Sequence, residues 1–221
     1  MKKELVIAAY DRELSWLSII NEDVKKTVYR KGNILPLEKD EILINPNLGR
    51  CVHTFFHHIY INYEKLSDVS FFAQDFPFDH WGNIIEIVNG DFTNLRNKAS
   101  LVIGEYYGFH NNNFGTAWTM YPSLQHGRGL IISCESNGHP QDHNPLIDVD
   151  SFWNILFESD CPNVYEFIPG GHFAIKKEQI HLRSRDFYKK VCELLLENIT
   201  APWMIERLEC YIFNPKFKTK L

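Results

Sequence analysis

Two carboxylates and an imidazole follow an apolar run in residues 69–80. The apolar part, residues 69–73, is typical of a buried strand, and Asp75, Asp79 and His80 come soon after its end. Divalent metal ions that carry phosphates take one or two carboxylate oxygens from the protein. The segment therefore indicates a metal or phosphate site, although Asp75 and Asp79 could instead form capping hydrogen bonds in a turn.

A second candidate site is the sequence Asn47-Leu48-Gly49-Arg50, which precedes a predicted helix. Free backbone amides at a helix N-terminus, a permissive glycine and a guanidinium suit an anionic or nucleotide group. The alternative is an ordinary Asn-Gly turn that carries a surface arginine.

Glu206 is a candidate general base on the last predicted helix of the chain. It follows Pro202 and Trp203, and a carboxylate held beside an aromatic residue has a raised proton affinity. Arg207 and Glu209 favour an alternative, in which this part of the helix is a solvated face with local ion pairs.

A glycine-rich turn, Gly170-Gly171, leads into His172 and a further predicted strand. Such a turn lets the backbone pass close to a bulky group, and His172 could be a metal ligand or a substrate contact. A tight turn between two core elements is the alternative.

Other histidines lack partners at ligand spacing. His53 and His57 are four residues apart, as in some zinc sites, but no glutamate follows His53 and no third ligand can be named. We expect structural or surface roles for this pair. The same expectation applies to His139, Asp142 and His143 in a loop-like segment.

These residues need a sheet to position them. Continuous apolar character over residues 4–10 and 69–73 predicts interior parallel strands, with another strand at 26–29. Apolar residues in residues 50–63 recur at helical spacing, which predicts an amphipathic helix. Ligands collect at the carboxyl ends of strands in such sheets, so Tyr10, Lys31 and residues 75–80 should line one crevice.

The rest of the chain shows weaker patterns. Residues 35–46 and 104–150 read as loops, with a strand only at 130–133, and a short helix is expected after Ser15. Later segments predict helices at 152–157, 176–180, 185–198 and 200–212, and a strand at 173–175. The overall expectation is one α/β domain with a mostly parallel mixed sheet flanked by helices.

Composition narrows the class of protein. The 221 residues are 44% hydrophobic and 14% aromatic, which allows a large core. A net charge of −5 gives no reason to expect a nucleic-acid partner. No apolar stretch is long enough for a membrane span and no secretion signal is evident, so we expect a cytoplasmic protein. Five scattered cysteines predict reduced thiols, and the motifs of serine hydrolases, P-loop proteins and dinucleotide-binding dehydrogenases are absent.

Several short blocks together carry a resemblance. Ser15-Trp16-Leu17, Pro46-Asn47-x-Gly49-Arg50, Pro77-Phe78-Asp79-His80, Phe173-Ala174-Ile175 and Glu206-Arg207-Leu208 resemble the pattern of an uncharacterised family of glycosyltransferase-like proteins, across nearly the whole chain. That family is similar to the GT-A class of nucleotide-sugar transferases. The resemblance implies a single-domain, Rossmann-like GT-A fold over residues 1–221, in which residues 1–100 bind the donor and residues 101–221 bind the acceptor.

The residue patterns and the resemblance together give roles for individual residues. Donor-binding positions would be Ala8, Ala9, Tyr10, Lys31, Asn47, Gly49, Arg50, Gln74 and Asp75. Metal-binding positions would be Asp75, Asp79 and His172, and catalytic positions Glu206, Asp79 and His80. No literal D-x-D motif follows the predicted strand at 69–73: Asp75 has the expected place after the strand, whereas Asp79-His80 has the family pattern. Cys51 replaces an acidic residue of that pattern.

The function that we expect from this resemblance is transfer of a sugar from a nucleoside diphosphate, with UDP favoured, to a hydroxyl of a glycan or glycoprotein. Mn or Mg would neutralise the leaving diphosphate. One alternative is a metal-dependent hydrolase of phosphate esters or sugar nucleotides that uses Asp75, Asp79, His80 and His172. Another is a non-catalytic module that binds glycans or nucleotides.

Overall fold

Seven strands form one mixed sheet in the computed structural model, which describes residues 1–31, 41–44, 47–92, 95–99, 101–109, 118–120, 148–162, 165–167 and 171–216. In hydrogen-bonding order they are β3 (Glu41–Ile44), β2 (Val24–Lys31), β1 (Lys3–Ala9), β4 (Val69–Gln74), β9 (His172–Lys176), β6 (Tyr106–Phe109) and β5 (Leu101–Ile103). A second, two-stranded sheet pairs β7 (Trp118–Met120) with β8 (Tyr165–Phe167). The prediction of an α/β fold with a mixed sheet is confirmed.

Strands β1 to β4 are parallel to one another. The direction in which the chain adds successive strands to the sheet reverses at β1. The chain runs from β1 outward to β2 and β3, and then returns to place β4 on the other side of β1. The register sets Ala8 beside Tyr29 of β2 and Gln74 of β4. The pairs β4–β9, β9–β6 and β6–β5 are antiparallel. The predicted residues Lys31 and Gln74 thus end strands of the parallel half, whereas His172 begins the antiparallel strand β9.

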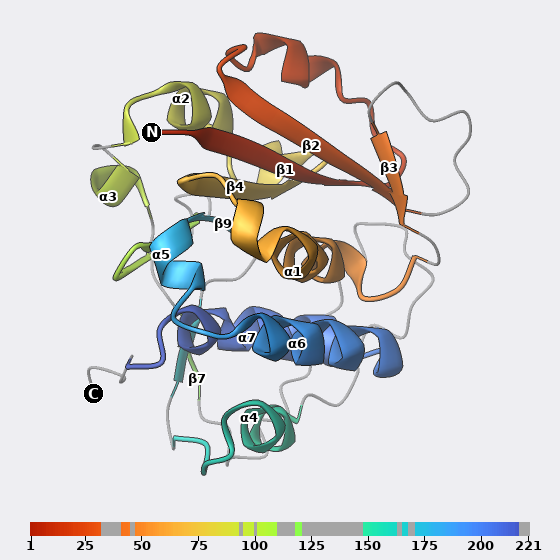
Figure 1. The fold of residues 1–221 in the computed structure, drawn as a ribbon, viewed down its shortest axis with the longest axis vertical. Coiled ribbons are helices and arrows are strands. Elements are labelled where there is room, and N and C mark those ends of the chain that lie inside the picture. The colour runs from red at the N-terminus through yellow and green to blue at the C-terminus, as the bar shows by residue number, and fades with distance from the viewer. Residues whose placement is uncertain are drawn as a thin grey trace.

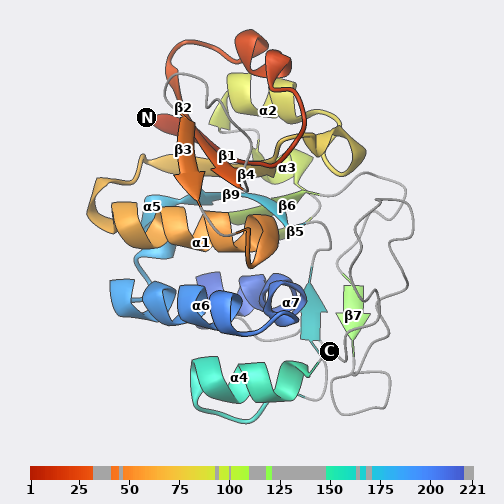
Figure 2. The ribbon, with the colours of Figure 1, turned by 90° about the vertical axis from the view of Figure 1, so that its right-hand side faces the viewer.

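Helices cover both faces of the sheet (Figures 1 and 2). Figure 2 shows the sheet between α2 and α1, with α6 and α7 beyond α1, and α4 beyond those. The helices are η1 (Ser15–Ile19), α1 (Arg50–Asn62), η2 (Tyr63–Lys65), η3 (Pro77–Asp79), α2 (Ile84–Asn89), α3 (Leu95–Lys98), α4 (Val149–Phe157), α5 (Lys177–Ile180), α6 (Arg185–Glu197) and α7 (Ala201–Phe213).

Helix α1 is the amphipathic helix that the apolar spacing predicts. Val52, Phe55, Phe56 and Ile59 are at most 3% exposed, because their spacing places them on the face that meets the sheet and α6. The helix begins at Arg50, near the end of the sheet where the parallel strands β1, β2 and β4 finish, and ends at Asn62 toward the opposite end. It therefore joins the two ends of one sheet face.

Two hydrophobic clusters fill the two faces of the sheet, because successive strand residues point to opposite faces. Val6 and Phe72 belong to the cluster under α1, α6 and α7, whereas Ile7 and Phe71 belong to the cluster with Trp81 under α2. Burial of this much apolar surface, at about 25 cal/mol per Å², is the main driving force for the fold.

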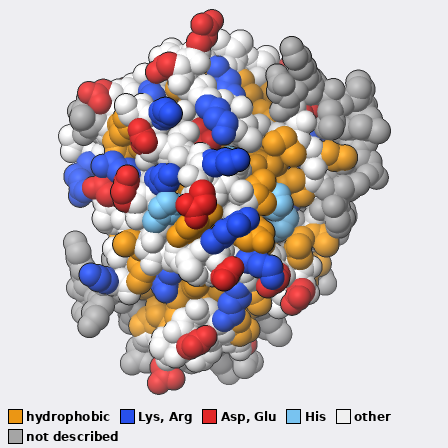
Figure 3. Space-filling view, viewed as in Figure 1, with side chains coloured by type: hydrophobic (Ala, Val, Ile, Leu, Met, Phe, Trp, Pro, Cys, Tyr) orange, Lys and Arg blue, Asp and Glu red, His pale blue; other side chains and the backbone are white. Residues whose placement is uncertain are grey.

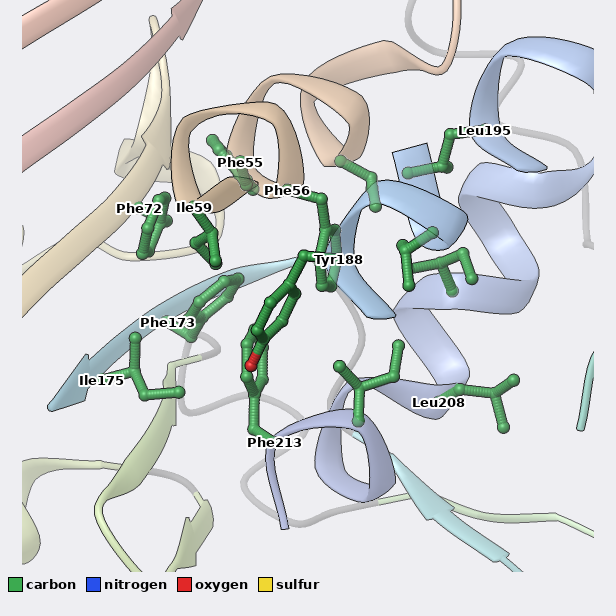
Figure 4. Close-up of a cluster of buried hydrophobic side chains, with 14 of the residues drawn as sticks. Phe55, Phe56, Ile59, Phe72, Phe173, Ile175, Tyr188, Leu195, Leu208 and Phe213 are labelled. Atoms are coloured by element: carbon green, nitrogen blue, oxygen red, sulfur yellow. The ribbon is translucent and has the colours of Figure 1, made fainter. Parts of the chain in front are cut away.

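Aromatic rings join three helices in the first cluster (Figure 4). Phe56 of α1 stacks on Phe213 of α7 with ring centroids 5.6 Å apart, and Tyr188 of α6 lies against both. The Tyr188 hydroxyl donates a hydrogen bond to the carbonyl of Ile180 at 2.7 Å, so its polar atom is satisfied within the core. This packing fixes α7, which carries Glu206, relative to α1.

Several elements differ from the sequence predictions. Residues 41–44 form the edge strand β3 inside a segment predicted as loop, and Ile42 and Leu43 are 44% and 40% exposed. A four-residue edge strand held by β2 has no buried periodicity to detect. β6 and β7 likewise lie in a segment predicted as loops, and α2, α3, β5 and β8 were not predicted. The predicted strand at 130–133 and the histidines 139 and 143 with Asp142 lie outside the described residues.

The surface of the described residues mixes charges of both signs. Acidic and basic side chains are interspersed on the face shown in Figure 3. Lys189 and Glu193 form a surface ion pair at 2.6 Å. None of the described helices is both long and apolar enough to cross a membrane. The expectation that no nucleic acid is bound stays a prediction.

Candidate active site

The carboxyl ends of β1, β2 and β4 bring the predicted segments to one edge of the sheet. Tyr10 follows β1, Lys31 ends β2, and Gln74 with Asp75 ends β4. The strand order reverses between β1 and β4, and open α/β sheets bind ligands outside such a reversal. We therefore take this edge, referred to below as the carboxyl edge, as the candidate active site.

At the end of β1 the side chains divide between core and solvent. Ala8 is 7% exposed and Ala9 is 1% exposed, and they belong to the two different hydrophobic clusters. Tyr10 is 44% exposed. Of the three predicted donor-binding residues here, only Tyr10 therefore offers its side chain at the edge.

Asp75 is buried and accepts hydrogen bonds from the backbone. Its Oδ2 accepts from the amides of Tyr10 at 2.8 Å and Arg12 at 3.2 Å, and its Oδ1 accepts from the amide of Phe76 at 3.0 Å. Its own carbonyl accepts from the indole of Trp16 at 2.8 Å. The capping role that the sequence left open for Asp75 is therefore present.

Asp79, His80 and His172 lie near one another beyond the end of β4. Nε2 of His80 is 3.8 Å from Oδ2 of Asp79, and the imidazole rings of His80 and His172 have centroids 5.7 Å apart. Asp79 and His80 are partly exposed, whereas His172, at the start of β9, is 1% exposed beside Trp81. Among the described residues no three His, Cys, Asp or Glu side chains form a metal-binding group. Whether these residues bind a metal stays a prediction.

Lys31 is buried beneath the turn that precedes α1. Its ammonium donates to the carbonyls of Leu48 at 2.6 Å and Arg50 at 2.7 Å, and the side chain is 3% exposed. Burial lowers the pKa of Lys31 to about 8, and the Cys51 thiol opposes this only in part. The predicted donor-binding lysine thus holds the Asn47–Arg50 turn in place, with its charge close to the edge.

The turn itself has a left-handed backbone at two consecutive residues. Gly49 has φ of 67° and Arg50 has φ of 52°. A Cβ on Gly49 would lie 2.6 Å from Cβ of His53 and 2.9 Å from the carbonyl of Leu195, so packing requires glycine here whether or not a ligand binds. Asn47 is exposed at the start of this turn.

Arg50 connects the turn to α7. Its guanidinium lies 4.4 Å from the ring centroid of Trp203, one helical turn before Glu206. The N-terminal part of α7 is thereby held beside the N-terminus of α1. Both Arg50 and Glu206, predicted from distant segments, thus lie at the carboxyl edge.

A hydrogen bond joins β4 to α1 in the same place. Nε2 of Gln74 donates to Sγ of Cys51 at 3.2 Å. Burial raises the pKa of the Cys51 thiol to about 11; the hydrogen bond from Gln74 lowers it and the charge of Glu206 raises it. The charge of Glu206 thus acts on a thiol that is hydrogen bonded to the end of β4, and the high pKa keeps this thiol protonated.

A second glutamate lies behind Glu206 on the same side of α7. Glu209 is 1% exposed, and the hydroxyl of Tyr106 donates to its Oε2 at 3.0 Å. Burial, and after it the charge of Glu206, raise the pKa of Glu209 well above its usual value. The alternative of a wholly solvated face for residues 206–209 is therefore wrong at Glu209.

Two of the histidines of α1, His53 and His57, lie side by side, and His53 lies under the turn that precedes the helix. Burial, together with the charges of Lys31 and His57, lowers the pKa of His53 to about 3. The rings of His53 and His57 lie 5.6 Å apart, and no third ligand approaches within the described part of the chain. A neutral His53 next to Gly49 fills space under the turn.

Comparison with known proteins adds a family to this geometry. A family model with the description "Protein of unknown function (DUF3431)" matches residues 5–220. The chain belongs to this family. No curated protein and no solved structure matches the chain.

Two residues of this DUF3431 site were missed by sequence reasoning. Cys51 was set aside as a replacement for an acidic residue, and the contact of Trp203 with Arg50 was not foreseen. Cys51 could have been found from its place in the first turn of the predicted helix, next to Arg50. Nothing in the sequence signals that Trp203, some 150 residues later in the numbering, meets the same turn. Gly171 has φ of 60°, as its predicted turn requires, and Gly170 lies outside the described residues.

Proposed function

We propose that this protein is a glycosyltransferase that moves a sugar from a nucleoside diphosphate sugar, with UDP favoured, to a hydroxyl of a glycan or glycoprotein acceptor. The observation that carries the proposal is the meeting of two groups at the carboxyl edge. A buried cation and a helix N-terminus come from the N-terminal half, and the carboxylate of Glu206 comes from the C-terminal half. The first group suits a diphosphate and the second suits an acceptor hydroxyl.

In this proposal the N-terminal half binds the donor. Backbone amides at the start of α1 and the guanidinium of Arg50 face the negative charge of the diphosphate. Lys31 adds a positive charge beneath the same turn. Tyr10, exposed after β1, lies at the strand reversal where a nucleoside would be bound.

Glu206 acts as the general base. It takes the proton of the acceptor hydroxyl as that oxygen forms a bond to the anomeric carbon, while the bond from the anomeric carbon to the diphosphate breaks. The displacement is direct, so the anomeric configuration inverts. Fixing of α7 by the Arg50–Trp203 contact and the aromatic core keeps this carboxylate oriented.

A divalent ion, Mn or Mg, fits the site only if it is shared with the diphosphate, because the described residues form no ligand cage of their own. Asp79, partly exposed near the end of β4, is the residue best placed to hold such an ion. When bound, the ion would neutralise charge on the leaving diphosphate.

The test is thermal unfolding in the presence of UDP, GDP, ADP and UDP-sugars, each with and without Mn. We expect UDP to raise the melting temperature, and Mn to increase that shift. D79A is the matched variant: it should reduce the additional shift from Mn while keeping the melting temperature of the free protein. Indifference to every nucleotide would contradict the proposal.

A hydrolase remains a second candidate because His80 lies between Asp79 and His172. Two imidazoles and a carboxylate in this arrangement could activate a water molecule. The two functions differ in their need for an acceptor. Donor breakdown at an equal rate with and without acceptor, lost in H80A, would favour the hydrolase over the transferase.

A further inference from the structure

One aspartate holds the whole connection between β1 and η1. The side chain of Asp75 binds the amides of Tyr10 and Arg12, and its backbone carbonyl binds the indole of Trp16. Its own amide donates to the carbonyl of Ala8 at 3.1 Å, which continues the pairing of β1 with β4. Residues 10–16 are therefore fixed to β4 at three points.

The hydrogen bonds nearly fill the acceptor capacity of the Asp75 carboxylate. A carboxylate offers about four lone-pair positions, and amides of Tyr10, Arg12 and Phe76 occupy three of them. The side of the carboxylate that these amides face is also positive, because each N–H dipole points its hydrogen at the oxygens. A cation at the same oxygens would have to displace the amides or approach against their dipoles.

We propose that Asp75 is a positioning residue that fixes residues 10–16 of the donor site, and that its carboxylate does not bind a metal ion. Only the identification of this site as the donor site rests on the proposed function. The positioning of residues 10–16 by Asp75 does not depend on it. It assigns the two acids of the segment different tasks: Asp75 faces the backbone, whereas Asp79 is half exposed.

The loop matters because it presents an exposed aromatic side chain at the strand reversal. Tyr10 is 44% exposed and Phe76, on the other side of Asp75, is 50% exposed. The amides of both residues are bound by the same carboxylate. Release of that carboxylate should therefore change the orientation of two aromatic side chains at once, and weaken ligand binding more than chemistry.

The first experiment measures amide hydrogen exchange and needs no activity. In D75A the amides of Tyr10, Arg12 and Phe76 should exchange about tenfold faster than in the wild type. D79A removes a carboxylate four residues away and should leave these rates unchanged. If D75A does not fold, D75N replaces it. Its amide has one oxygen, which can accept either from the amides of Tyr10 and Arg12 or from the amide of Phe76, but not from both sets. Unchanged exchange in the folded variant would overturn the proposed positioning role.

The second experiment separates positioning from metal binding. Mn binding at a saturating concentration of UDP, followed by electron paramagnetic resonance, should be equal in D75A and the wild type. In a glycosyl transfer assay D75A should raise KM for the donor about tenfold, change kcat by less than about threefold, and keep the Mn concentration for half activation. A tenfold loss of Mn affinity in D75A, with D79A unaffected, would overturn the proposal. Absence of any transfer by the wild type would instead contradict the proposed function, and the exchange result would still decide the role of Asp75.

Discussion

Two polar groups lie on the same face of the sheet, under opposite ends of α1, and they differ in how their members are bound. The amino-end group consists of Glu4, Tyr29, His58 and Ser70. The carboxyl-edge group consists of Lys31, Arg50, Cys51, Gln74 and Glu206. Both contain ionisable side chains close to the core, so burial and polarity alone do not distinguish a structural cluster from a site.

The members of the amino-end group bind mainly one another, and one exposed lysine, Lys25, also reaches Oε2 of Glu4 at 3.2 Å. Oε1 of Glu4 accepts from Ser70 at 2.8 Å and lies 3.3 Å from Nε2 of His58, whose Nδ1 lies 2.9 Å from the hydroxyl of Tyr29. Glu4 and His58 are fully buried. Burial opposes ionisation of Glu4, but the hydrogen bonds and charges around it, His58 first, outweigh burial and lower its pKa to about 2. The group resembles a catalytic triad in composition, yet no substrate could reach it.

The carboxyl-edge group is bound to the backbone and to neighbouring segments instead. Lys31 donates to turn carbonyls, Gln74 donates to Cys51, and Arg50 lies over Trp203. Its members come from β2, α1, β4 and α7, and they gather where the strand order reverses. The comparison teaches that location at the carboxyl ends of strands, and not composition, marks the candidate site.

The largest expected effect comes from Glu206. E206Q should lower kcat for glycosyl transfer by about a thousandfold, because the amide cannot accept the acceptor proton, while the Kd for a UDP-sugar stays nearly unchanged. Activity assays and isothermal calorimetry measure the two quantities.

The matched control for this substitution is E209Q. Glu209 is buried beneath the surface of α7, and glutamine keeps its size and can still accept the hydrogen bond from Tyr106, so kcat should change by less than about threefold. Full activity in E206Q, or equal losses in both variants, would remove Glu206 from the active site.

Glu4 should affect stability and leave activity intact. E4Q should lower the free energy of unfolding at pH 7 by about 3 kcal/mol, because it breaks a buried charged network. Urea unfolding measures the change, and E22Q at an exposed glutamate is the control. Loss of activity per folded molecule in E4Q would contradict the assignment of a purely structural role to the amino-end group.

The same network predicts a pH dependence of stability. The folded pKa of Glu4 is about 2 and its ordinary value is 4.5. The stabilisation is therefore complete above pH 4.5 and is lost as the pH falls from 4.5 to 2, by about 3 kcal/mol in all. E4Q should lack this part of the acid dependence.

Gly49 tests whether the turn of the carboxyl-edge group is required by packing. G49A should lower the free energy of unfolding by about 2 kcal/mol, because the added Cβ meets His53 and Leu195 in a left-handed backbone. In G171A the φ is similar but no atom of the described residues lies within 4 Å of the added Cβ, so the cost should be about 1 kcal/mol. Chemical denaturation compares the two, and equal costs would mean that packing does not require Gly49.

Lys31 gives the smallest effect and a pH signature. Its charge, lost above a pKa of about 8, should strengthen UDP binding about fivefold at pH 7 relative to pH 9, which corresponds to roughly 1 kcal/mol. K31M should bind UDP more weakly at pH 7 and show no change between these pH values. An equal pH dependence in K31M would assign the titration to another group.

Much of the fold could be predicted from local patterns. The helix α1 and the final helices follow from apolar periodicity, and the strands β1 and β4 follow from continuous apolar runs; both patterns depend only on neighbouring residues. β3 and β6 could not be predicted, because β3 is held by its pairing with β2 and the aromatic residues of β6 become strand residues by pairing with β9. Strand pairing is a long-range property, and short edge strands carry little pattern of their own.

The candidate site divides in the same way. The sequence by itself determined that Asp75, Asp79 and His80 follow a buried strand, that Gly49 precedes a helix, and that a carboxylate stands at Glu206. Only the tertiary structure decided that Asp75 is occupied by backbone amides and that Glu206 approaches Cys51. Residue type fixes what a side chain can accept or donate, but its partners depend on which segments the sheet and the aromatic core bring together.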